Sequence, residues 1–268
     1  MSIYKKFNED ISVIKVSDKN FTANISENWS IGQTANGGYS MAIIAKACSE
    51  HLDHKDPLVL SANYLERVEF GPADIEIFKI SSSKSTSTAS ITLKQKGIIK
   101  IFATATFTDF SKMKGINEKL REEPIFDLYE DCIQVPYEEG FNPKLDKNLE
   151  KKYCLDSIWW DKPNNTNNAC LNLYMGWKDG GKVDLFGLIL FLDATTPPIF
   201  NKMGTVGWVP TLTLTSHIRN LPKPGPLKVI AKTEFITNNY IEEDREIWDT
   251  EGNLVGQSKQ LAKLRIKK

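Results

Sequence analysis

The chain has 268 residues, of which 41% are hydrophobic and 25% charged, a mixture typical of a folded protein rather than a disordered one. Its 34 basic residues balance 34 acidic ones, so no net positive charge favours nucleic acid as the main partner. The first 20 residues lack the apolar core of a signal peptide, and the most apolar stretch, residues 185–192, is too short to span a bilayer. We therefore expect a cytoplasmic protein that does not insert into membranes.

The first half of the chain predicts one buried helix. Asn36 is a good helix-capping residue, Gly37 and Gly38 allow other backbone to come close, and residues 39–45 are almost uniformly apolar. A helix that is hydrophobic nearly all round is buried on several sides. The strand-like segments that follow are residues 58–64, 74–81, 86–95 and 98–107. A buried helix followed by antiparallel strands indicates a sheet that wraps around the helix.

The second half repeats this order. Residues 183–193 form a second apolar helix candidate, which Pro197 and Pro198 end. The strand candidates of this half are residues 171–177, 211–218, 227–236, 240–249 and 254–266. Gly71 and Gly97 are 26 positions apart, and Gly225 and Gly252 are 27 positions apart, which indicates a duplicated domain. We expect an N-terminal domain over residues 1–112, a connector with one short helix at most over 113–152, and a C-terminal domain over 153–268.

Short motifs stand at corresponding places in the two halves. The first half has Gly32-Gln33-Thr34-Ala35-Asn36-Gly37-Gly38 before its helix and Tyr64-Leu65-Glu66-Arg67 after it. The second half has Leu192-Asp193-Ala194, Pro210-Thr211-Leu212 and Ser258-Lys259-Gln260. In this order and spacing the motifs resemble the TesB-type acyl-CoA thioesterases. The resemblance implies an α+β double hotdog, in which two antiparallel sheets each wrap around one buried helix and join into one continuous sheet.

The resemblance also implies a catalytic site. In that family an Asp, a Thr and a Gln hold the water that attacks the thioester carbonyl, and the matching residues are Asp193, Thr211 and Gln260. A carboxylate at the end of a buried helix is partly desolvated, which raises its basicity towards the range of a general base. Backbone N–H groups at Gly37 or Gly38 are candidates to bind the substrate by steadying its oxyanion. Tight packing would explain these two glycines equally well.

The expected reaction is hydrolysis of acyl-CoA to free acid and CoA at one site per chain, with no metal or redox cofactor. The residues after Thr211 depart from the His- and Trp-containing pattern of the bacterial enzymes, so the length of the acyl chain stays open. Two other functions also stay open: an acyl-binding double hotdog without catalysis, and a hydroxyacyl dehydratase or hydratase that would use His217. The four cysteines lack the CxxC spacing of a zinc site, and the three histidines are too separated to suggest a catalytic metal centre. Self-association into a homo-oligomer is also left open.

Overall fold

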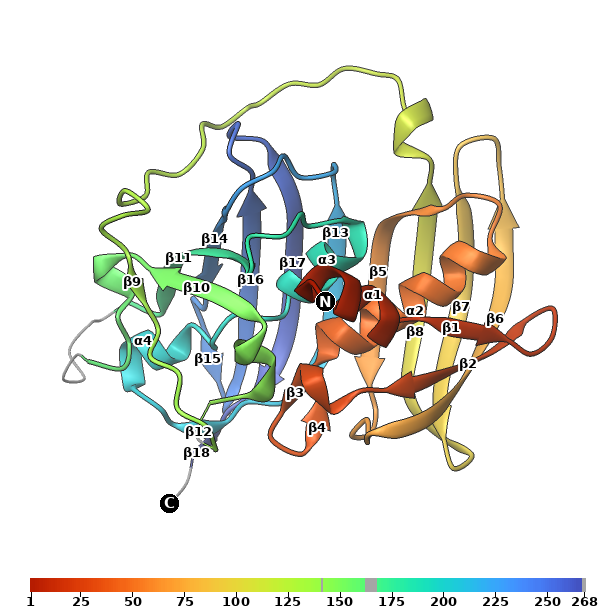
Figure 1. The fold of residues 1–268 in the computed structure, drawn as a ribbon, viewed down its shortest axis with the longest axis horizontal. Coiled ribbons are helices and arrows are strands. Elements are labelled where there is room, and N and C mark those ends of the chain that lie inside the picture. Colours follow the sequence, from red (N-terminus) through yellow and green to blue (C-terminus); the bar gives the residue numbers. More distant parts are fainter. Residues whose placement is uncertain (141, 162–167, 267–268) are drawn as a thin grey trace.

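Two halves of similar build lie side by side in a computed structural model that describes residues 1–140, 142–161 and 168–266 (Figure 1). The first half packs α2 (Gly37–His51) against a sheet with the strand order β1 (Val13–Lys15), β2 (Asn20–Ile25), β6 (Gly71–Ser82), β7 (Ser87–Gln95), β8 (Ile98–Thr108) and β5 (Asp56–Tyr64). The second half packs α3 (Leu185–Phe191) against β13 (Thr211–Ile218), β17 (Leu254–Lys263), β16 (Tyr240–Trp248), β14 (Leu227–Lys232), β11 (Cys170–Trp177), β10 (Leu149–Tyr153) and β9 (Ile133–Gln134).

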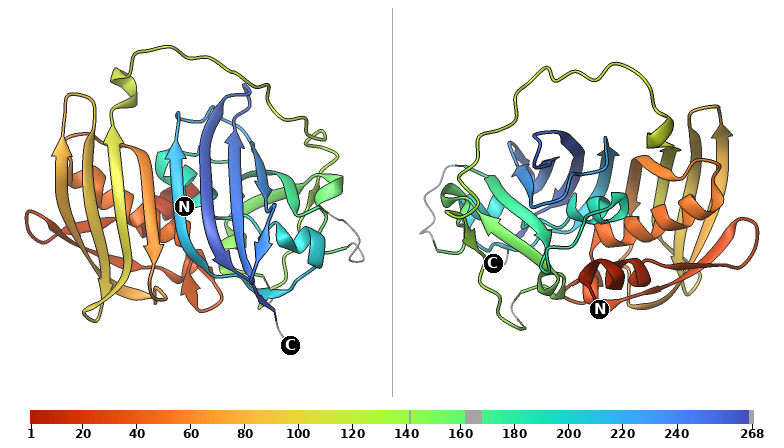
Figure 2. Two further views of the ribbon diagram at one scale, coloured as in Figure 1. Left: turned by 180° about the vertical axis from the view of Figure 1, so that it is seen from behind. Right: turned by 45° about the horizontal axis from the view of Figure 1, so that its top comes forward.

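The two sheets are joined into one. Strands β5 and β13 pair in antiparallel register, with Asn63 opposite Thr213 and Val59 opposite His217. The view from behind shows the strands of both halves as one curved surface with the helices on its other side (Figure 2). The continuous, duplicated α+β sheet expected from the resemblance is therefore confirmed.

Both buried helices begin at a capping side chain. Asn36 accepts a hydrogen bond from the amide of Tyr39 at 2.9 Å, as its sequence position predicted, and Asp184 accepts one from the amide of Gly187 at 2.7 Å. The side chains of α2 from Met41 to Ala45 are fully buried. Because α3 ends at Phe191, the second helix is shorter than the predicted 183–193.

The predicted strand 227–236 is wrong at its end. β14 stops at Lys232, and residues 236–237 form a separate strand, β15 (Ile236–Thr237), which pairs with β16. The amides of Glu234 and Phe235 donate instead to Glu242 Oε1, at 2.6 and 2.9 Å, so they cannot continue the ladder. The predicted strand 254–266 is likewise divided, because β18 (Arg265–Ile266) leaves the main sheet to pair with β12 (Gly207–Trp208).

Several elements were not predicted. The N-terminal helix α1 (Ile3–Asp10) buries Phe7 completely, with its ring 5.0 Å from that of Trp29 and 5.1 Å from that of Trp177. The others are β1, β2, β3 (Ser30–Ile31), β4 (Thr34–Ala35), β9, β10, β12, α4 (Ile199–Met203) and the 3₁₀ turns η1 (Glu27–Trp29), η2 (Phe110–Lys112) and η4 (Leu155–Ser157). The connector also holds one short 3₁₀ helix, η3 (Lys144–Lys147).

The connector arches from the end of β8 over to the second half (Figure 1). Irregular structure was expected for the connector, but it also contains β9 and the start of β10, which ends at Tyr153. Both strands extend the second sheet. The domain boundaries at 112 and 152 stay predictions. None of the helices formed by the described residues is both long and apolar enough to cross a membrane.

Candidate active site

Asp193 lies where the two halves meet, directly after α3 and facing the start of α2. Its Oδ2 accepts hydrogen bonds from the Gly38 amide at 2.9 Å and from Asn36 Nδ2 at 3.0 Å. Asn36 Nδ2 also lies 3.2 Å from the Asp193 carbonyl oxygen. Asp193 is only 7% exposed. Both of these bonds end on Oδ2, and the Gly37 amide contributes a further hydrogen bond to the carboxyl group.

The glycines at the start of α2 permit this close approach. A Cβ atom on Gly37 would lie 2.9 Å from Asp193 Oδ2 and from the Tyr64 hydroxyl, and one on Gly38 would lie 2.9 Å from the Leu190 carbonyl oxygen. The Gly38 amide faces Asp193, as expected, but it donates its hydrogen bond to the Asp193 carboxylate and not to a substrate oxygen. The role of Gly37 and Gly38 in steadying an oxyanion stays a prediction.

Burial changes the acidity of Asp193. Desolvation raises the pKa of its carboxyl above the ordinary value, because the charged form loses water. The charge of Arg245 and the hydrogen bonds from Gly38 and Asn36 act in the opposite direction, but burial prevails. The carboxylate is thereby a stronger base than an exposed aspartate, as its position at the end of a buried helix predicted.

Thr211 reaches the inner face of the sheet through an irregularity in β13. Leu214 and Ser216 point inward, so regular alternation would turn Thr211 outward. The register against β17 shifts between Thr211 and Thr213, which places Thr211 opposite the buried Ala262. Its hydroxyl consequently lies 3.5 Å from Gln260 Oε1.

Two charged residues of β16, Glu243 and Arg245, belong to the site and were missed from the sequence. Both are almost completely buried, at 0% and 2% exposure, and they form an ion pair. Gln260 Nε2 donates to Glu243 Oε2 at 2.7 Å, and Arg245 Nε donates to the Thr195 hydroxyl at 2.6 Å. Burial raises the pKa of Glu243, and Arg245 opposes this.

A sequence signal for this pair existed. Ile241 and Ile247 mark the inward face of the strand, and the alternate positions between them are Glu243 and Arg245. Charges at inward positions are rare unless they are paired or functional. The pair also orients Gln260: with its amide nitrogen bound to Glu243, the amide oxygen is turned towards Thr211.

A pocket of about 740 Å³ brings the predicted groups together. Asp193, Thr211 and Gln260 all line it, and so do Glu243 and Arg245. His217 does not. It is exposed on the outer face of β13, opposite Gln257 of β17, so the histidine considered for a dehydratase lies away from this pocket.

Comparisons with known proteins agree with the two-part architecture. Residues 25–108 match the family model of the acyl-CoA thioesterase N-terminal domain, and residues 129–264 match that of the acyl-CoA thioesterase C-terminal domain. An uncharacterised protein of Mycobacterium tuberculosis is 23% identical over 269 residues, covering 90% of each chain.

Solved structures share the fold. A Thermobifida fusca protein provisionally assigned as a thioesterase II superposes with a TM-score of 0.89 at 24% identity, over 97% of both chains. A hot dog protein of unknown function from Alicyclobacillus acidocaldarius gives 0.86 at 18% identity, over 98% of this chain and 99% of the other. The acyl-CoA thioesterase II TesB2 of Mycobacterium marinum gives 0.76 at 12% identity, over 97% and 98%.

Proposed function

Because the chain belongs to the acyl-CoA thioesterase family, whose two domain models it matches, we propose that it hydrolyses acyl-CoA thioesters to the free acid and CoA. One observation carries the proposal. A buried carboxylate, Asp193, is anchored by hydrogen bonds beside a pocket in which Thr211 and Gln260 also present polar atoms. These three groups can hold and activate a water molecule without a metal ion.

The proposed reaction uses Asp193 as the general base. Thr211 and the Gln260 amide oxygen hold the water, and the Asp193 carboxylate takes a proton from it as the water oxygen attacks the thioester carbonyl. The carbon–sulfur bond then breaks, and the proton held on Asp193 passes to the leaving CoA thiolate. Gly37 and Gly38 remain our proposed donors to the oxyanion, although the Gly38 amide would have to leave Asp193 Oδ2 to serve in this way.

The pocket contains complementary groups for both parts of the substrate. Trp159, Phe200 and Trp208 line it with aromatic surface suited to an acyl chain. Arg67, Lys263 and Arg265 also line it, and within the described residues none of these three has a carboxylate partner. Unpaired cations suit the phosphate groups of CoA.

Release of free thiol from short-, medium- and long-chain acyl-CoAs tests the proposal. We expect turnover with at least one chain length and a matching yield of free acid. Tight binding of acyl-CoA without thiol release, across the whole panel, would favour the non-catalytic acyl-binding protein instead. Loss of substrate without thiol release would point to hydratase chemistry.

A further inference from the structure

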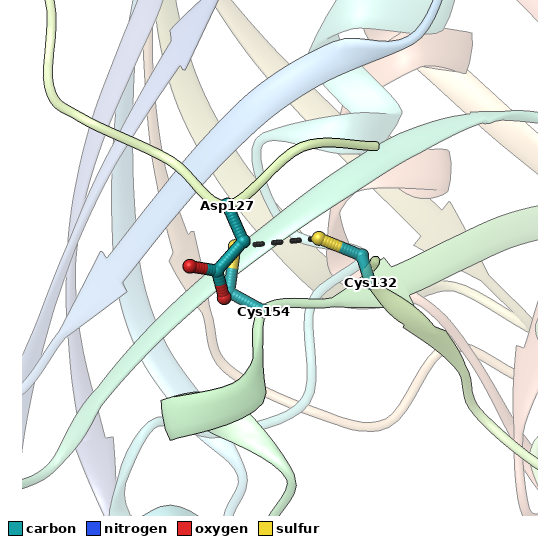
Figure 3. Close-up of side chains that lie close together, drawn as sticks. All are labelled: Asp127, Cys132 and Cys154. Carbon is teal, nitrogen blue, oxygen red and sulfur yellow. Dashed lines mark hydrogen bonds between the residues drawn. The ribbon is translucent and has the colours of Figure 1, made fainter. Parts of the chain in front are cut away.

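A second polar cluster lies outside the proposed active site, where the connector meets the second sheet. Cys132 directly precedes β9 and Cys154 directly follows β10, and their sulfur atoms are 3.6 Å apart (Figure 3). Asp127 completes the group: one of its carboxylate oxygens and the two sulfurs lie within 4.8 Å of one another. Both thiols are buried, whereas Asp127 is exposed.

The spacing of these atoms fits a bound metal ion. Zinc lies about 2.3 Å from each thiolate in a tetrahedral site, so two sulfurs bound to one ion are about 3.8 Å apart. The observed separation needs almost no adjustment. A disulfide would require the sulfurs to approach to about 2.05 Å. We propose that Asp127, Cys132 and Cys154 bind one zinc-type divalent cation, with a water molecule as the fourth ligand.

The surroundings already hold the carboxylate in place. The Leu155 amide donates to Asp127 Oδ2 at 2.8 Å, which leaves Oδ1 as a metal ligand. The Tyr174 hydroxyl donates to the Asp127 carbonyl oxygen at 3.0 Å. Hydrogen bonds of this kind orient metal ligands in many proteins. Lys152 lies beside the cluster over the Tyr129 ring, and its positive charge would balance the net negative charge of two thiolates, one carboxylate and a divalent ion.

Metal binding would displace protons from both sulfurs. Burial raises the pKa of the Cys132 thiol above its ordinary value and raises that of Cys154 to about 12. A divalent ion replaces two protons as the two thiolates form. The bound ion would tie residues 127–132 of the connector to the end of β10.

Cobalt(II) provides a spectroscopic probe that does not depend on enzyme activity. We expect the metal-free, reduced full-length protein to bind one Co²⁺ with a near-ultraviolet thiolate-to-cobalt band, and excess Zn²⁺ to remove that band. Cys132→Ser and Cys154→Ser should each abolish or strongly reduce it. Asp127→Asn changes an exposed side chain and keeps an oxygen that can accept from the Leu155 amide, and it should weaken Zn²⁺ binding by about tenfold or more.

Cys48→Ser and Cys170→Ser are the matched controls and should bind cobalt as the unaltered protein does. Absence of a charge-transfer band in the unaltered protein would overturn the proposal. So would a band that persists when both Cys132 and Cys154 are replaced by serine. If the reduced protein binds no metal but peroxide links the two cysteines, the pair is a redox pair and the metal site is rejected.

Discussion

The Gly38 amide donates a hydrogen bond of 2.9 Å to Asp193 Oδ2, so the first half of the chain holds the carboxylate that the second half supplies. Asn36 adds a second bond to the same oxygen. The duplicated halves are therefore unequal partners in one site. Each buried helix has a capping side chain, and the start of α2 also binds a carboxylate from the other half. This relationship leads to four predictions.

Asp193→Asn should lower kcat by about 10²- to 10⁴-fold, the usual contribution of a general base. The melting temperature should change little, because the asparagine oxygen can still accept from Gly38 and Asn36. Thiol release and thermal unfolding measure the two effects. Asp244→Asn, on the outer face of β16 and paired with Lys259, is the control and should keep full activity. Equal turnover in Asp193→Asn and the unaltered enzyme would exclude Asp193 as the base.

Asn36→Ser should separate the two functions of Asn36. Serine caps helices about as well as asparagine, so the cap is kept and the stability lost should be that of the buried hydrogen bond to Asp193, about 1.5–3 kcal/mol. The bond from Nδ2 to Asp193 is lost, and the pKa of Asp193, already raised by burial, should rise further. Since the base must be unprotonated, activity is lost as the pH falls through this pKa. The acidic limb of kcat/KM should therefore move to higher pH.

Asn36→Ala is the companion variant for that experiment. It removes both the helix cap and the bond to Asp193, so it should cost about 1 kcal/mol of stability in addition. It should show the same movement of the acidic limb. An acidic limb that stays in place in both variants would mean that Asn36 does not control Asp193.

Replacing Glu243 and Arg245 together should uncouple stability from activity. Glu243→Leu alone leaves a buried guanidinium unpaired and should cost about 3–5 kcal/mol. The double variant Glu243→Leu/Arg245→Met should regain most of that stability, because apolar residues often replace a buried ion pair without loss. The double variant also loses the Arg245 charge that lowers the pKa of Asp193, so kcat is measured on the plateau above the acidic limb. It should still fall there by about 10- to 100-fold, since Gln260 has lost the acceptor that orients its amide.

Adding Gln260→Ala to that double variant provides the control. If Glu243 acts by orienting Gln260, the extra substitution should lower kcat much less than Gln260→Ala does in the unaltered enzyme. Fully additive losses would show that the two residues act independently.

Gly38→Ala should disturb the contact between the two buried helices. Its methyl group would lie 2.9 Å from the Leu190 carbonyl oxygen and 3.0 Å from that of Ile189, and these backbone atoms cannot move aside as a flexible side chain can. We expect a loss of about 1–3 kcal/mol in the free energy of unfolding, together with reduced turnover. Gly176→Ala, where a Cβ atom meets no neighbour within 4 Å, should change neither. Unchanged denaturation by urea in Gly38→Ala would contradict the contact.

The hydrophobic pattern of the sequence determined the duplicated fold. Two nearly uniform apolar helices, each followed by β-branched strands of similar spacing, indicate a helix buried against a sheet in each half. The resemblance added that the two sheets join into one. Asn36 also could be assigned as a cap from its position alone. The extra strands and α1 could not be predicted from the sequence, because their segments are short and contain charged residues. The helix α1, for example, packs Phe7 against the distant residues Trp29 and Trp177.

The site itself depended on the tertiary structure. The resemblance to a known family predicted Asp193, Thr211 and Gln260. The irregularity that turns Thr211 inward comes from the pairing of β13 with β17, and the alternation of residues along β13 does not reveal it. The bond from Asn36 to Asp193, the bond from Gln260 to Glu243 and the contact of Cys132 with Cys154 join residues that are 157, 17 and 22 positions apart. Secondary-structure preference acts within a few residues of the chain. The pKa of Asp193, the orientation of the Gln260 amide and the spacing of the two cysteine sulfurs depend instead on which distant atoms the folded sheet brings together.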